Sequence, residues 1–129
     1  MKRLPPNEEI FKCFEINLYE AALKSNPNNI EALRFLGYTY SKEGYHEKAL
    51  EVDKRLVRLL PEEAIIHYNL ACSYSQLNQI DSAFNELEMA ILLGYNEWKH
   101  MEHDEDLNNM KKDPRYKQLI SSLKKKYIV

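Results

Sequence analysis

The 129-residue sequence repeats itself with a period of 34 residues. The pattern Leu-Gly-x-x-Tyr at 36–40 returns as Leu-Ala-x-x-Tyr at 70–74, and Ala49 returns as Ala83 at the same offset. Periods of 20 to 50 residues are typical of proteins that stack one small supersecondary unit several times. We therefore expect this chain to be built from one such unit, used more than once.

Within each period the apolar residues indicate two amphipathic helices. In the first period they recur at helical spacing from Ile30 to Tyr40, and the run ends at Gly44, which suits a left-handed C-cap. A second run follows and stops at Pro61, because proline cannot continue a helix. The chain has only 3 Gly and 5 Pro, too few for the many tight turns of an all-β fold.

These helical units resemble the tetratricopeptide repeat. The family places a small residue at its eighth position, where two helices cross closely, and Gly37 and Ala71 stand there. Its twentieth position is alanine, as in Ala49 and Ala83, and its terminal proline is matched by Pro61. The sequence departs from the pattern at the usual fourth-position tryptophan, which is replaced by Leu33 and His67, and Tyr95 replaces the second terminal proline.

The resemblance implies an all-α fold, a right-handed superhelical solenoid of antiparallel helix pairs, and the apolar periods predict about seven helices. We expect one domain over 1–129. Its predicted parts are a half-repeat or N-terminal cap helix at 7–27, a first repeat at 30–63, a second at 64–97, and divergent C-terminal capping helices at 98–129. Asp113 and Pro114 are predicted to open the last helix as N-cap and first helical residue.

Charge and composition exclude several classes of partner. The formal net charge is −2, which gives no general attraction to nucleic acid or to an anionic membrane. No apolar run reaches the length of a membrane span. Met1-Lys2-Arg3-Leu4 leads into Pro5-Pro6 without the apolar stretch of a signal peptide, so we expect a cytoplasmic protein with reduced thiols at Cys13 and Cys72.

The sequence gives little support for catalysis. It contains no glycine-rich phosphate loop, no nucleophile elbow and no paired-cysteine metal motif. We therefore expect no enzyme activity, no catalytic residue, no cofactor and no metal site. The nearest metal-like cluster is His100-x-x-His103-Asp104-Glu105-Asp106, in which the two histidines could hold a divalent ion with Asp104. Its simpler interpretation is a solvated acidic turn.

The resemblance also implies a binding surface, because the first helix of each repeat lines the concave face of the solenoid. We expect a protein or peptide partner there, with the chain acting as an adaptor or scaffold. Tyrosines offer flat contact area with a hydroxyl group, and cations suit acidic ligands. The predicted groove residues are Arg34, Tyr38, Lys42, Ile65, Tyr68, Asn69, Cys72, Gln76 and Lys99.

A narrower form of this prediction and one alternative remain open. Some tetratricopeptide domains clamp acidic C-termini through Lys, Asn, Asn, Lys and Arg, and the corresponding residues here are Arg34, Tyr38, Asn69, Lys99 and His103. Only two of these positions match. The alternative is a self-assembling homo-oligomer without a separate ligand, in which the exposed flank of the N-terminal half-repeat takes another chain's helix. The identity of a partner does not follow from the sequence.

Overall fold

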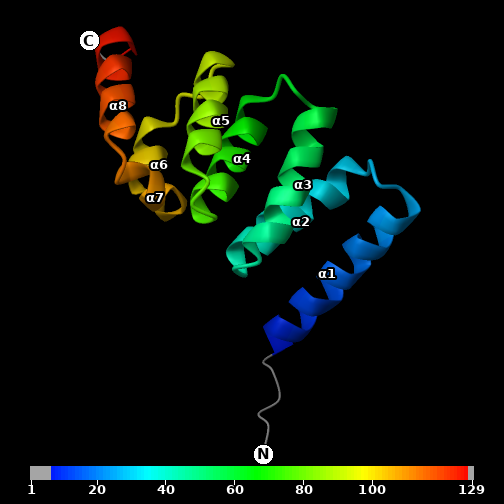
Figure 1. Ribbon diagram of the computed structural model, residues 1–129. Coiled ribbons are helices and arrows are strands. Elements are labelled where there is room, and N and C mark those ends of the chain that lie inside the picture. The colour runs from blue at the N-terminus through cyan, green and yellow to red at the C-terminus, as the bar shows by residue number, and fades with distance from the viewer. Residues whose placement is uncertain (1–6, 128–129) are drawn as a thin grey trace, which may run out of the picture. The chain divides into compact units, whose positions relative to one another are not determined.

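The computed structural model describes residues 7–127, which form α-helices joined by short turns with no strand among them (Figure 1). The chain divides into two compact units, Met1–Leu60 and Pro61–Val129, and each is described by itself. Met1-Lys2-Arg3-Leu4 and Pro5-Pro6, on which the cytoplasmic prediction rests, lie outside the described residues. None of the described helices is both long and apolar enough to cross a membrane.

The described part has eight α-helices and one 3-10 turn, one helix more than expected. The difference arises after residue 97, where an extended residue, Asp104, interrupts the chain. The helices are α1 Asn7–Ser25, α2 Ile30–Lys42, α3 His46–Leu59, α4 Ala64–Gln76, α5 Ile80–Leu92, α6 Trp98–His103, η1 Glu105–Leu107 (the 3-10 turn), α7 Asn108–Lys111 and α8 Pro114–Tyr127.

In the first unit α2 and α3 form a helical hairpin. Asn29 caps the start of α2 by accepting a 3.0 Å hydrogen bond from the backbone N–H of Ala32. Gly44 ends the hairpin's first arm with a φ of 86°, as its sequence position predicts. The two helices cross at Gly37, where an added Cβ would lie 2.9 Å from Asp53 Oδ1 and 3.4 Å from Val52 Cγ1. This close approach explains why the eighth position is small.

Helix α1 packs against α2 along one side only. The rings of Tyr19 and Phe35 stack with centroids 4.2 Å apart, and Lys12 Nζ lies 2.7 Å from Glu43 Oε1. No residue of α1 is fully buried. This helix therefore keeps much of its apolar surface in contact with solvent.

In the second unit α4 and α5 form the equivalent hairpin, and the C-terminal segment completes its core. Ala71, Phe84 and Leu87 of the hairpin pack in one cluster with residues that follow it. Three of those later residues are completely buried: Met101, Leu107 and Met110. Without the C-terminal segment, the apolar side chains of the hairpin would lose these contacts, so the segment is part of the fold of this unit.

The 34-residue spacing of helix starts continues to the end of the chain. First helices of each pair begin at Ile30, Ala64 and Trp98, and second helices begin at His46, Ile80 and Pro114. The third first helix is divided into α6, η1 and α7. The C-terminal segment therefore keeps the spacing of a repeat whose first helix is broken, although its apolar pattern no longer shows it.

Helix α8 is held to α5 by an arginine. Asp113 accepts a hydrogen bond from the backbone N–H of Arg115 at 2.9 Å, and α8 begins at Pro114 as the sequence predicts. The Arg115 guanidinium reaches Asp81 at 2.8 Å and lies 4.6 Å from the centre of the Phe84 ring. The same guanidinium lowers the pKa of the Asp113 carboxyl, chiefly through its side-chain hydrogen bond.

Candidate functional site

Three of the predicted groove residues form a ladder on α2. Arg34, Tyr38 and Lys42 follow one another at intervals of four residues, so they lie on one face of the helix, and all three are exposed. The Tyr38 ring is 68% exposed, and Lys42 Nζ lies 5.7 Å from its centre. This face offers a guanidinium, a phenol and an ammonium group to a partner. We call it the α2 ladder.

The equivalent positions of α4, 34 residues later, are covered. Tyr68 is 2% exposed and Cys72 is 6% exposed, while Gln76 is half-buried. Tyr68 donates its hydroxyl to Asp104 Oδ2 at 2.6 Å, and Gln76 Nε2 donates to Asp106 Oδ1 at 2.8 Å. Two carboxylates of the chain itself therefore lie against this part of α4.

Local structure holds these carboxylates in place. The extended backbone of Asp104 ends α6, and its Oδ1 accepts a 3.0 Å hydrogen bond from the backbone N–H of Asp106, which caps η1. Lys111 Nζ donates to the carbonyl of Asp104 at 3.1 Å and to that of Glu102 at 2.8 Å. The buried Leu107 fixes the other end of this short turn.

A pair of stacked tyrosines supports the covered region. The Tyr68 and Tyr95 rings lie 4.3 Å apart with an angle of 7° between their planes. Burial raises the pKa of Tyr95 to about 12. Burial also raises the pKa of Tyr68 well above its usual value, with Cys72 and the bond to Asp104 adding to the effect. Both phenols thus remain neutral at physiological pH, and Tyr68 acts as a hydrogen-bond donor.

The remaining predicted residues are exposed. Ile65, at 47% exposure, and Asn69 lie one turn apart on α4, and Lys99 lies on α6. The predicted set thus separates into exposed residues and three that are covered by the chain's own acidic turn. The sequence did not reveal this turn's position, because Asp104 and Asp106 are about one repeat away from their partners and no local spacing connects them.

The same region brings together atoms that could hold a metal ion. The side-chain donor atoms of Cys72, Asp104 and Asp106 lie within 4.8 Å of one another, and His100 Nε2 lies 3.3 Å from Asp104 Oδ2. Thiolate, carboxylate and imidazole are ligands of Zn²⁺. The hydrogen bonds of Tyr68 and the capping of η1 also account for the same carboxylate positions. The sequence pattern indicated the two histidines with Asp104 and Asp106, but it gave no sign of Cys72, which lies 32 residues before Asp104.

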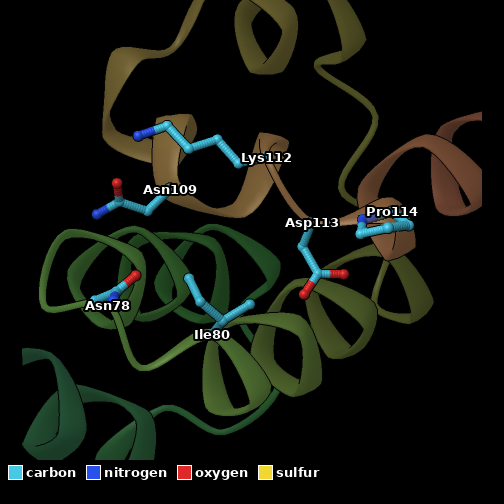
Figure 2. Close-up of a pocket in the computed structure, with 6 residues that line it drawn as sticks. All are labelled: Asn78, Ile80, Asn109, Lys112, Asp113 and Pro114. Atoms are coloured by element: carbon cyan, nitrogen blue, oxygen red, sulfur yellow. The ribbon is translucent and has the colours of Figure 1, made fainter.

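An open pocket lies beside the turn between α4 and α5 (Figure 2). Asn109 closes the end of α4 by donating from Nδ2 to the carbonyl of Ser75 at 2.8 Å, so it has a structural role. Asp113 is bound by Arg115. The residues that line the pocket are Asn78, Ile80, Asn109, Lys112, Asp113 and Pro114.

Comparison with known families decides the classification. A family model for the tetratricopeptide repeat matches residues 64–93, which contain α4 and α5. The chain is a tetratricopeptide repeat protein. This assignment agrees with the small residues at the helix crossings and with the all-α hairpin architecture. Repeats of this family are typically protein-interaction modules.

Two relatives extend the comparison. The repeat protein is 35% identical over 95 residues to a chloroplastic protein of Arabidopsis thaliana, a match that covers 71% of this chain and 28% of that protein. It is also similar to the crystal structure of MamA, with a TM-score of 0.60 and 29% identity over 73% of this chain and 57% of that one. The chain thus spans between about a quarter and three fifths of these relatives.

Proposed function

We propose that this repeat protein binds an acidic protein or peptide segment through the α2 ladder, and that it acts as an adaptor or scaffold rather than as an enzyme. One observation carries the proposal: Arg34, Tyr38 and Lys42 are all exposed on one face of α2. An acidic segment could pair with the two cations, while Tyr38 supplies apolar contact and a hydroxyl group.

The second unit supports the acidic character of the ligand. At the positions equivalent to the α2 ladder, Tyr68 and Gln76 bind carboxylates of Asp104 and Asp106. On α2 two of the three equivalent positions carry positive charge instead, and charged donors bind carboxylates more strongly than neutral ones. The exposed Ile65, Asn69 and Lys99 are further candidate contacts. Tyr68, Cys72 and Gln76 would contact a ligand only if the acidic turn moved.

Fluorescence anisotropy would test the proposal with labelled ten-residue peptides. One set would be rich in Asp and Glu, and a matched set would carry Asn and Gln at the same positions. We expect binding of acidic peptides only, weakening as salt rises because the pairs are exposed. The Arg34→Ala/Tyr38→Ala variant should lose binding with little change in helical content or melting temperature. Arg58→Ala, which removes an exposed cation from α3, is the matched control.

Each result has a definite meaning. Equal binding of acidic and amide peptides would reject the acidic specificity. Retention of acidic-peptide binding by the double variant would place the binding surface elsewhere. A true carboxylate clamp would in addition require a free terminal carboxylate, so a C-terminally amidated acidic peptide separates that narrower prediction from the general one.

A further inference from the structure

Helix α1 exposes a continuous row of large apolar side chains. Ile10, Phe11, Phe14 and Leu18 are 51%, 67%, 64% and 55% exposed. They recur at helical spacing and lie on one face; we call them the α1 stripe. Among the described helices, only α1 exposes four large apolar side chains by more than half. Contiguous apolar surface of this kind marks an interaction site.

The repeat register shows which residues stand at the equivalent positions of a complete pair. The residues 34 positions after Phe11, Phe14 and Leu18 are Tyr45, Lys48 and Val52. Tyr45 and Lys48 contact α2, the first helix of their pair, but remain exposed, whereas Val52 is buried. The Tyr45 ring lies 6.3 Å from that of Tyr40, and Lys48 Nζ lies 5.5 Å from the same ring.

Val52 lies at the helix crossing, 3.4 Å from the Cβ position that an added side chain at Gly37 would take. Its equivalent in the second pair, Glu86, is hydrogen-bonded to His67 of α4. At the position equivalent to Leu18, therefore, the second helix of each complete pair packs against a first helix. The α1 stripe is the same face on a second helix for which the described residues contain no first helix.

We propose that a second copy of this chain covers the α1 stripe with its own α1, packed antiparallel. The covering element must be an amphipathic helix whose apolar face is not already used. Helices α2 to α5 are each paired in a hairpin, whereas α1 presents the required face in every copy. Two identical faces that meet about a two-fold axis form a closed dimer.

Size and charge favour the antiparallel direction. The N-terminal half of α1 is bulky at Ile10 and Phe11, while its C-terminal half carries the small Ala21 and Ala22. Antiparallel packing lays the bulky half of one copy over the small half of the other, which allows close packing. It also brings Glu8 of one copy towards Lys24 of the other, whereas a parallel pair would bring like charges together.

Light scattering and sedimentation equilibrium would test the dimer with the chain as it stands. We expect a mass that rises with concentration from 15.3 kDa towards twice that value. Phe14→Glu should raise the dissociation constant by roughly tenfold to a hundredfold, because each copy loses a buried aromatic contact. Leu92→Glu alters a side chain that is 79% exposed on α5 and should leave the dimer unchanged. Circular dichroism would verify that each variant folds.

Cross-linking would test the direction of packing. Cys72 is buried and Cys13 is exposed, so a Cys13→Ser background allows a new cysteine to be placed at either end of α1. A short bismaleimide should join an Asn7→Cys chain to a Ser25→Cys chain, and should not join two Asn7→Cys chains. Joining of like ends would overturn the antiparallel arrangement. A wild-type mass of one chain at all concentrations, or a dimer insensitive to Phe14→Glu, would overturn the proposal itself.

Discussion

The two complete helical hairpins share their register but differ where their helices cross. In the first hairpin Leu33 and Val52 are both buried and apolar. The equivalent residues of the second, 34 positions later, are His67 and Glu86, whose Nδ1 and Oε2 atoms lie 2.6 Å apart. The same positions of the repeat thus hold two packed apolar side chains in one hairpin and a hydrogen-bonded His–Glu pair in the other.

A second pair of positions differs in the same coordinated way. Gly37 of the first hairpin lies beside Asp53, whereas the second hairpin has Ala71 and Leu87 there. The residue at the eighth position is thus glycine where its neighbour is a buried carboxylate, and alanine where its neighbour is a leucine. The helix crossing therefore accepts different side-chain chemistry, provided that both partners change together. Substitutions that move one hairpin towards the other test this conclusion.

The largest effect is expected at Gly37. A leucine there would overlap Asp53 and Val52, and overpacking of this kind costs about 3 kcal/mol of unfolding free energy or more. Urea unfolding followed by circular dichroism measures the loss, while fluorescence of Trp98, the single tryptophan, reports on the second unit.

Smaller changes at the same crossing sharpen the test. Gly37→Ala should cost less than Gly37→Leu, and Gly37→Ala with Asp53→Leu should recover stability, because it copies the second hairpin. If the double variant is less stable than Gly37→Ala alone, Asp53 has a role that the second hairpin does not reproduce.

A smaller effect is expected from the His67–Glu86 pair. His67 is bonded at both nitrogens, to Glu86 at 2.6 Å and to the carbonyl of Pro61 at 2.7 Å. His67→Leu leaves both acceptors without this partner and should cost about 2 to 3 kcal/mol. His67→Leu with Glu86→Val copies the first hairpin and should recover most of that loss. A double variant whose loss equals the sum of the two single losses would show that the residues are energetically independent.

Much of the fold could be predicted because the repeat controls local structure. The helix start at Ile30 was predicted from the repeat register and that at Pro114 from the pair Asp113-Pro114, and Gly44 follows from the need for a left-handed residue. The register of the family also indicated Arg34, Tyr38 and Lys42 as groove residues; all three are exposed, and their role in binding stays a prediction. These features depend on residues close in sequence, where spacing and residue type carry the information.

Other features depend on contacts that spacing does not encode. The position of Asp104 and Asp106 against α4 requires the extended break after α6, and the bond between His67 and Glu86 joins two helices. The start at Pro114 was predicted, but the 34-residue spacing of the third repeat's helix starts was missed, because its first helix is divided and its apolar period is lost. The prediction that the groove residues face a ligand therefore remains a proposal for the six that are exposed: Arg34, Tyr38, Lys42, Ile65, Asn69 and Lys99.

The smallest effect is expected where the two hairpins differ at the turn. Gly44 has a φ of 86° and its equivalent, Asn78, a φ of 59°, a region that favours glycine over other residues. Gly44→Ala should lower the free energy of unfolding by about 1 kcal/mol. The whole loss should come from backbone strain, because an added Cβ would meet nothing within 4 Å. Asn78→Gly should gain a few tenths of a kcal/mol, because asparagine tolerates this region less well than glycine. If Asn78→Gly instead lowers the free energy of unfolding measured in urea, the asparagine side chain beside Asn109 stabilises this turn.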